Sequence, residues 1–177
     1  MKTMEKFFLN GKDFPNAKCQ AANKDTVSKC FYASELTKYV DPSIQIMFLD
    51  SYYDSWNAQE ILGISCTEEF GSLSECTTEN RNYVQTYHKK IVATMNDLIK
   101  LPNVSAFGIA CVAHFLTNGK WDNTDYSVPM GSNNTAEAIM TKWLNSKTSE
   151  TFRLLDTVEW PDNKVCSHQV KYNLAQE

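Results

Sequence analysis

The chain has 177 residues, of which 42% are hydrophobic and 21% are charged, a composition typical of one globular domain with a sizeable core. Its formal net charge is -4, and basic residues do not cluster beyond pairs such as Lys89-Lys90, so a nucleic-acid partner is not expected. No apolar run is long enough to span a membrane. We expect a single domain over residues 1–177.

The first regular element that the sequence predicts with a strong pattern is a strand. Residues 10–42 are mostly polar, and only a short helix around residues 33–39 is expected there, with Ser34 as its cap. Residues 43–49 then form a short, continuous apolar run. Continuous apolarity, in contrast to alternation, indicates a strand that is covered on both faces, as in a parallel sheet.

A long amphipathic helix should follow over residues 79–100, with Thr77 or Thr78 as its N-cap. Residues 104–110 predict a second buried strand, and strand, helix and strand together form a βαβ unit, in which the strands are parallel. The apolar residues of the helix recur at helical spacing and form one stripe: Val84, Tyr87, Ile91, Met95, Leu98 and Ile99.

A last helix is expected over residues 135–144, and the chain after Trp160 is expected to be irregular. The fold class is therefore α/β, with parallel strands and a crossover helix.

Cysteine usage bears on the cellular compartment. The sequence contains no C-x-x-C pair, and its three histidines do not stand at zinc-finger spacing, so we expect no structural zinc site and no other metal or cofactor. Cys19/Cys30 and Cys66/Cys76 each bracket a short polar stretch, which suits local disulfides. The pairing of Cys111 and Cys166 stays open.

Two N-glycosylation sequons begin at Asn103 and Asn133. Together with the cysteines they favour a secreted or lumenal protein. The first residues, MKTMEKFFLNG, do not form a signal peptide, because no long apolar segment and cleavage site are present. We therefore expect the complete protein to carry a further N-terminal segment.

Polar side chains follow both predicted strands. Asp50 and Asp54 come after the first strand, and His114 comes after the second. Active sites of open α/β sheets lie at the carboxyl ends of the strands. Serine hydrolases of the α/β type carry their triad in the chain order Ser, Asp or Glu, His, and Asp54 and His114 fit its last two members. His88 and His168 are interpreted as structural or surface residues.

The chemistry explains why this pair matters, although simpler interpretations stay open. An imidazole must take the proton of a serine before the hydroxyl becomes a good nucleophile, and a carboxylate orients that imidazole. An aspartate after a strand is also a common turn former or helix cap. No G-x-S-x-G nucleophile elbow occurs, since Gly71-Ser72 and Gly131-Ser132 lack the second glycine and follow Asp54.

Several short motifs, taken in order, resemble the C-terminal part of the pectin acetylesterase/Notum family of α/β hydrolases. Ser51-Tyr52-Tyr53-Asp54 is similar to the acid motif of the family, and Ala110–His114 is similar to its Cys-x-x-His motif. The resemblance runs from roughly Phe7 to Trp143, and also includes Trp121, Gly131-Ser132 and Thr135–Ala138. Where the family usually has Gln three positions after the acid, this chain has Asn57, with Gln59 two positions further on.

The resemblance implies a serine carboxylesterase that removes an O-linked acyl group from a polysaccharide or a secreted protein. It assigns Asp54 and His114 to the triad, makes Asp50 a structural acid, and lets Tyr53 and Trp56 shield the Asp54 carboxylate. The serine and oxyanion hole of the family lie upstream of the matched region, so this chain should be an incomplete, inactive part of the hydrolase domain.

Two other classes stay open, a non-catalytic binding protein on a degenerate hydrolase scaffold and an unrelated small disulfide domain. The oligomeric state is not predicted.

Overall fold

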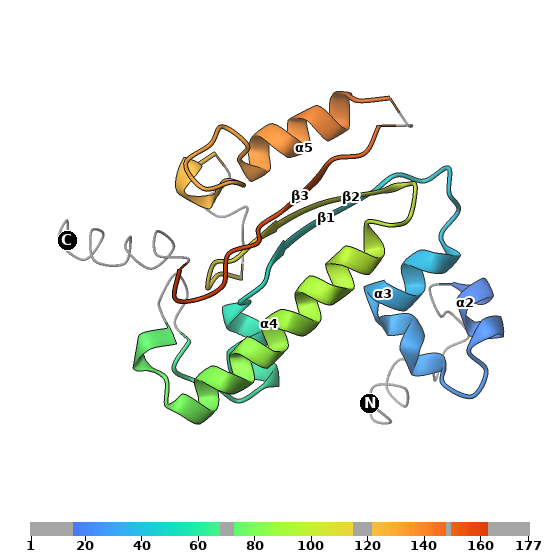
Figure 1. The fold of residues 1–177 in the computed structure, drawn as a ribbon. Helices are drawn as coiled ribbons and strands as arrows, with labels where there is room; N and C mark the ends of the chain where they lie inside the picture. The colour runs from blue at the N-terminus through green and yellow to red at the C-terminus, as the bar shows by residue number, and fades with distance from the viewer. Residues whose placement is uncertain (1–15, 68–72, 115–121, 148–149, 163–177) are drawn as a thin grey trace.

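A computed structural model describes residues 16–67, 73–114, 122–147 and 150–162 (Figure 1). Its centre is a three-stranded parallel sheet in the order β1-β2-β3, formed by β1 (Ile46–Ser51), β2 (Val104–Ile109) and β3 (Arg153–Leu155). The predicted α/β fold class is confirmed, as is the parallel pairing of the first two strands. The third strand was not predicted.

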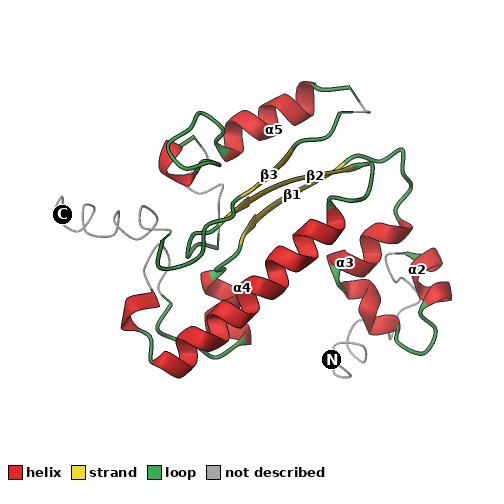
Figure 2. Ribbon diagram, viewed as in Figure 1, coloured by secondary structure: helices red, strands yellow, loops and turns green. Residues whose placement is uncertain are grey.

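One helix covers each face of the sheet (Figure 2). Helix α4 (Thr78–Leu98) connects β1 to β2 on one face, and α5 (Ala136–Asn145) connects β2 to β3 on the other. Both helices begin with a threonine cap, because the Thr77 hydroxyl accepts from the Asn80 amide at 3.2 Å and Thr135 caps α5 in the same way. The two βαβ crossovers explain why all three strands run in one direction.

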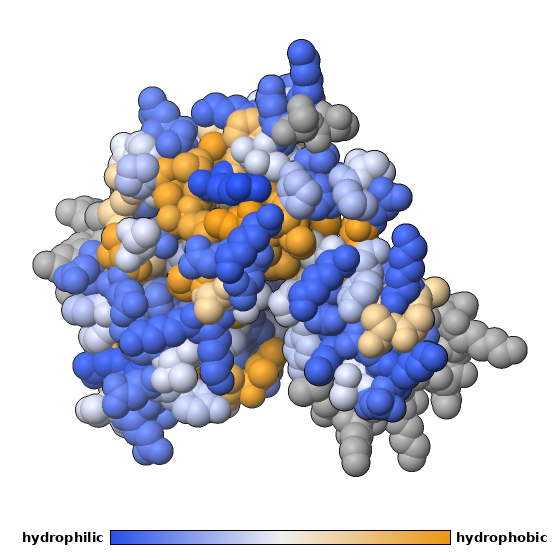
Figure 3. Space-filling model, turned by 45° about the vertical axis from the view of Figure 1, so that its right-hand side comes forward, coloured by the Kyte–Doolittle hydropathy of each residue, from blue (hydrophilic) through white to orange (hydrophobic). Residues whose placement is uncertain are grey.

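The continuous apolar run of β1 packs on both sides of the sheet. Ile46 and Phe48 face the cluster under α4, whereas Met47 and Leu49 face the cluster under α5. β1 is at an edge of the described sheet, and these four side chains are only half-buried. On the face shown in Figure 3, apolar side chains gather in one large area.

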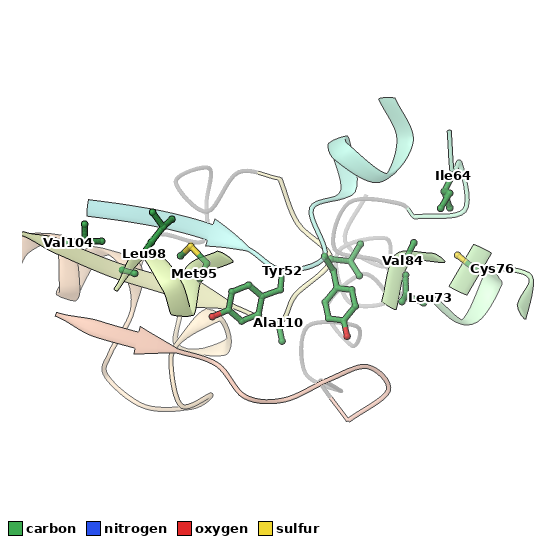
Figure 4. Close-up of a cluster of buried hydrophobic side chains, with 12 residues drawn as sticks. Tyr52, Ile64, Leu73, Cys76, Val84, Met95, Leu98, Val104 and Ala110 are labelled. Carbon is green, nitrogen blue, oxygen red and sulfur yellow. The ribbon is translucent and has the colours of Figure 1, made fainter. Parts of the chain in front are cut away.

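The cluster under α4 depends on a close approach between Tyr52 and Gly108. Asp50 pairs with Gly108 in the register of β1 and β2, and the ring of Tyr52 lies against Gly108. A Cβ at position 108 would come within 2.4 Å of the Tyr52 hydroxyl oxygen, so only glycine fits there. Figure 4 shows Tyr52 among the buried side chains of this cluster.

The segment before β1 has more regular structure than expected. It contains two α-helices, α2 (Ala17–Ala22) and α3 (Ala33–Leu36), and two 3₁₀ turns, Val27–Phe31 and Thr37–Tyr39. These elements are short, and each alone is too short to be stable, so packing and a local disulfide hold them together. The helix expected near residues 33–39 starts after Tyr32, and no side chain of the described residues caps it.

Two further short elements flank α4 and α5, namely a 3₁₀ turn at Leu73–Glu75 and another at Thr124–Tyr126. Within the described ranges, no helix is both long and apolar enough to cross a membrane.

Candidate active site

The loops that follow β1 and β2 are tied together directly. The Ser51 hydroxyl, at the end of β1, donates a hydrogen bond to the Cys111 carbonyl in the loop after β2. The Tyr52 amide donates to the Ile109 carbonyl at 2.8 Å, which extends the pairing of the two strands by one residue. The carboxyl ends of two adjacent strands therefore present their next side chains at one rim of the sheet.

Asp54 and His114 meet at this rim. His114 Nδ1 lies 2.9 Å from Asp54 Oδ2 and 3.1 Å from Oδ1. The aspartate side chain is 8% exposed and the histidine side chain is 27% exposed. A shielded carboxylate thus holds an imidazole that still reaches the surface.

The same carboxylate also starts a helical segment. Asp54 Oδ1 accepts a hydrogen bond from the Asn57 amide at 2.8 Å, and the Asp54 carbonyl accepts one from the Ala58 amide at 2.9 Å. This segment continues as a π-helix over Asn57–Ile61. An aspartate after a strand can cap a helical segment or hold a histidine. The Asp54 side chain does both, and the cap fixes the position of its carboxylate.

This geometry determines which imidazole nitrogen is available for chemistry. A carboxylate that accepts from Nδ1–H fixes the tautomer in which Nε2 carries the lone pair. It also stabilises the imidazolium that forms when Nε2 takes up a proton. The arrangement can therefore move a proton to and from a group that faces Nε2.

The two aromatic side chains that flank Asp54, Tyr53 and Trp56, contact different histidines. Trp56 stacks on His114, with ring centroids 5.5 Å apart and planes at 25°. The ring of Tyr53, which was also expected to shield the carboxylate, stacks on His88, and its hydroxyl donates to Gln85 Oε1 at 2.7 Å. Trp56 is therefore the aromatic side chain that contacts His114.

Asp50 lies four residues before Asp54 and differs from it. It sits at the end of β1 on the α4 side, among the residues that line a cavity of about 230 Å³. Burial raises the pKa of the Asp50 carboxyl to about 6, and the negative charge of Asp54 adds to the shift. The imidazole is held by Asp54, which agrees with the interpretation of Asp50 as a structural acid.

Tyr87 and Asn57 belong to the surroundings of the site, and the sequence did not assign them to it. Burial raises the pKa of the Tyr87 hydroxyl to about 12, the charges of Asp54 and Asp50 act in the same direction, and a hydrogen bond with Asn57 opposes the shift. Tyr87 was recognised only as part of the apolar stripe of α4. The one signal for Asn57 was its place three residues after the acid.

His88 lies in the core, away from the rim. It is 3% exposed, its ring stacks on Tyr53 at 4.4 Å, and it meets Tyr52 edge-on at 5.7 Å. Neither of its ring nitrogens has a hydrogen-bond partner in the described part of the chain. Burial lowers the pKa of His88, so it is a neutral packing ring. His168 and Trp121 lie outside the described residues.

Two disulfides join neighbouring segments, Cys19 with Cys30 and Cys66 with Cys76. The first pins α2 to the 3₁₀ turn that follows it, and the second closes the loop before α4. Cys111 is also disulfide-bonded, whereas Cys166 lies outside the described residues. In the described ranges, no three His, Cys, Asp or Glu side chains come together so as to hold a metal ion.

The two sequons differ in accessibility. Asn103 is 5% exposed and its amide donates to the Ile44 carbonyl at 2.8 Å, so the folded chain does not present it for glycosylation. A glycan at Asn103 stays a prediction, and this burial in the folded chain argues against it. Asn133 is exposed just before α5.

An acid and an imidazole that follow adjacent parallel strands in this order are the arrangement of the acid–base half of an α/β-hydrolase triad. The sequence model of the pectinacetylesterase family matches residues 4–167, and the chain belongs to this family. A search of the curated proteins found no match, and a search of the solved structures found none either. The family is one of esterases, and its name points to an acylated polysaccharide as the class of substrate.

Proposed function

We propose that the chain serves carboxylic ester hydrolysis by a serine mechanism, in which Asp54 orients the base and His114 moves the proton. The observation that carries this proposal is the 2.9 Å contact between Asp54 Oδ2 and His114 Nδ1 at the carboxyl ends of two parallel strands. Family membership supports the reaction class.

The proposed steps follow from that geometry. His114 Nε2 takes the proton of a serine hydroxyl while the serine oxygen attacks the ester carbonyl. The imidazolium, stabilised by Asp54, returns this proton to the leaving alcohol as the carbon–oxygen bond breaks, which leaves an acyl-enzyme. Water then repeats both steps at the acyl group and releases a carboxylic acid and the free serine.

The serine is assigned to a part of the protein outside these 177 residues, because the chain contains no G-x-S-x-G elbow. The isolated chain should then hydrolyse p-nitrophenyl acetate no faster than an equal concentration of free imidazole. An activity of the isolated chain that depends on His114 would instead place the nucleophile within it.

The substrate is proposed to be an O-acetylated polysaccharide, following the family, and the site of action an oxidising compartment outside the cytosol. The two disulfides support the compartment, since such bonds persist in secreted and lumenal proteins. Asn133 is the proposed glycan acceptor.

The decisive experiment uses the full gene product and p-nitrophenyl acetate. Asp54→Asn keeps the size of the side chain but removes the charge that orients His114, so kcat should fall about 10⁴-fold. Asp25→Asn, the same change at an exposed position, is the matched control and should leave kcat within about twofold. Equal activity of the Asp54 and Asp25 variants would refute the role of Asp54.

A further inference from the structure

The rim of the sheet carries a half-exposed aromatic ring directly beside the imidazole of His114. Trp56 is 49% exposed, although it is one of the largest side chains of the chain. Part of its ring stacks on His114, and the remainder faces solvent. Leaving so much apolar area in water forgoes the stabilisation that burial would give.

The segment after Trp56 has a rare backbone conformation. It is a π-helix, in which the Leu62 amide donates to the Asn57 carbonyl at 3.0 Å, and such turns are frequent at functional sites. Glu60 is exposed, and Ile61 is 65% exposed.

We infer that Trp56 is a platform for a sugar ring, which stacks on the indole and so presents the ester of an acylated polysaccharide to His114. The inference rests on the proposed function and adds the position of the polysaccharide chain. A pyranose ring offers a flat face of C–H groups, which the negative face of an indole attracts.

An acyl chain fits this surface less well than a sugar. Hydrophobic stabilisation grows with the apolar area removed from water, so an acyl chain gains most in an enclosed pocket. A half-exposed ring encloses little. The platform therefore binds the sugar part of the substrate. The contact between Trp56 and His114 sets the distance between this sugar and the imidazole.

Binding to the full gene product tests the inference without any need for turnover. The probes are xylotriose, which is neutral, trigalacturonate, which is anionic, and octanoate, which represents an acyl chain. The indole N–H signal of Trp56, assigned with a Trp56→Phe variant, should shift on titration with at least one trisaccharide. The two trisaccharides distinguish a neutral from an anionic polysaccharide.

Two substitutions give the matched comparison. Measured by titration calorimetry, which does not need the indole signal, Trp56→Leu should weaken trisaccharide binding about tenfold or more. Trp56→Phe should weaken it less, because a smaller ring remains. Tyr83→Leu removes another exposed aromatic, on α4, and should leave the affinity within about twofold.

The inference is overturned if neither trisaccharide shifts the Trp56 signal in the wild-type chain, if Trp56→Leu and Tyr83→Leu bind equally, or if only octanoate shifts the signal. Because the signal is measured in the wild-type chain, the test stands even if Trp56→Leu fails to fold. A failure of the proposed esterase would appear instead in the hydrolysis of p-nitrophenyl acetate, a substrate that contains no sugar.

Discussion

The turn after β1 contacts two histidines that lie in opposite surroundings. Its Tyr53 stacks on His88 in the core, and its Trp56 stacks on His114 at the rim. His88 is 3% exposed and neither nitrogen has a hydrogen-bond partner among the described residues, whereas His114 is paired with Asp54 and reaches the surface.

The difference shows what makes an imidazole suitable for proton transfer. Both rings have an aromatic neighbour, so stacking does not distinguish them. A buried imidazole without a partner incurs a desolvation penalty for its charged form and stays neutral. An imidazole beside a carboxylate and near solvent can take up a proton and release it. The carboxylate and the access to solvent therefore separate the proposed base from the packing ring.

The largest expected effect comes from making one substitution at both positions. In the full gene product, His114→Phe removes the proposed base and should lower kcat for p-nitrophenyl acetate by about 10⁴-fold or more. His88→Phe replaces one flat ring with another in the core and should keep kcat within about tenfold. A larger loss at position 88 than at position 114 would reverse the comparison.

The second prediction concerns Gly108, whose lack of a side chain leaves room for the ring of Tyr52. Gly108→Ala places a methyl group where the Tyr52 ring lies, so the free energy of unfolding should fall by about 2 to 4 kcal/mol. Urea denaturation measures this loss. In a Tyr52→Ala background, which removes the clash, the loss caused by Gly108→Ala should become much smaller. An equal loss in both backgrounds would show that the ring is not the obstacle.

The third prediction concerns Asp50 in β1, whose substitution should change the free energy of unfolding by a smaller amount. The folded-state pKa of Asp50 is raised to about 6 from its usual value of 3.8, so its contribution to stability is present below pH 3.8 and is lost as the pH rises through 6. Asp50→Asn should therefore stabilise the chain by about 1 to 2 kcal/mol at pH 8. The gain should disappear near pH 4. Urea denaturation at both pH values checks this, and a gain that is equal at both would contradict it.

The smallest effect is the pH dependence that His88 contributes. Its pKa is lowered in the folded chain, so stability is fully present above its unfolded pKa of 6.5 and decreases as the pH falls below that value. Lys89 opposes the charged form of His88, while Glu159 and Asp156 favour it, and burial outweighs them. Melting temperatures between pH 7.5 and 5 should fall less in His88→Phe than in the wild type. Parallel curves would contradict this prediction.

The sequence predicted the elements that carry a strong local pattern. The apolar runs and the helical stripe identified β1, α4 and β2, and their order implied parallel strands. Because the ends of such strands meet at one rim, the order of Asp54 and His114 was sufficient to bring the pair together in the prediction. The three-residue strand β3 has too little pattern of its own, and its pairing with β2 defines it.

The sequence could not predict the directions of the side chains in the turn after β1. Tyr53 and Trp56 are both aromatic and both flank Asp54, and only packing against α4 and the loop after β2 sends them to different histidines. The burial of His88, in contrast, follows from its spacing of four residues from Val84 on α4, a signal that was present in the sequence.

The most direct test of the pairing between Asp54 and His114 is nitrogen NMR of the histidine ring in the 177-residue chain. We predict that the neutral ring of His114 carries its proton on Nδ1, and that Asp54→Ala, but not Asp25→Ala, redistributes it. A neutral ring protonated on Nε2 in the wild type, or a spectrum that Asp54→Ala leaves unchanged, would contradict the account.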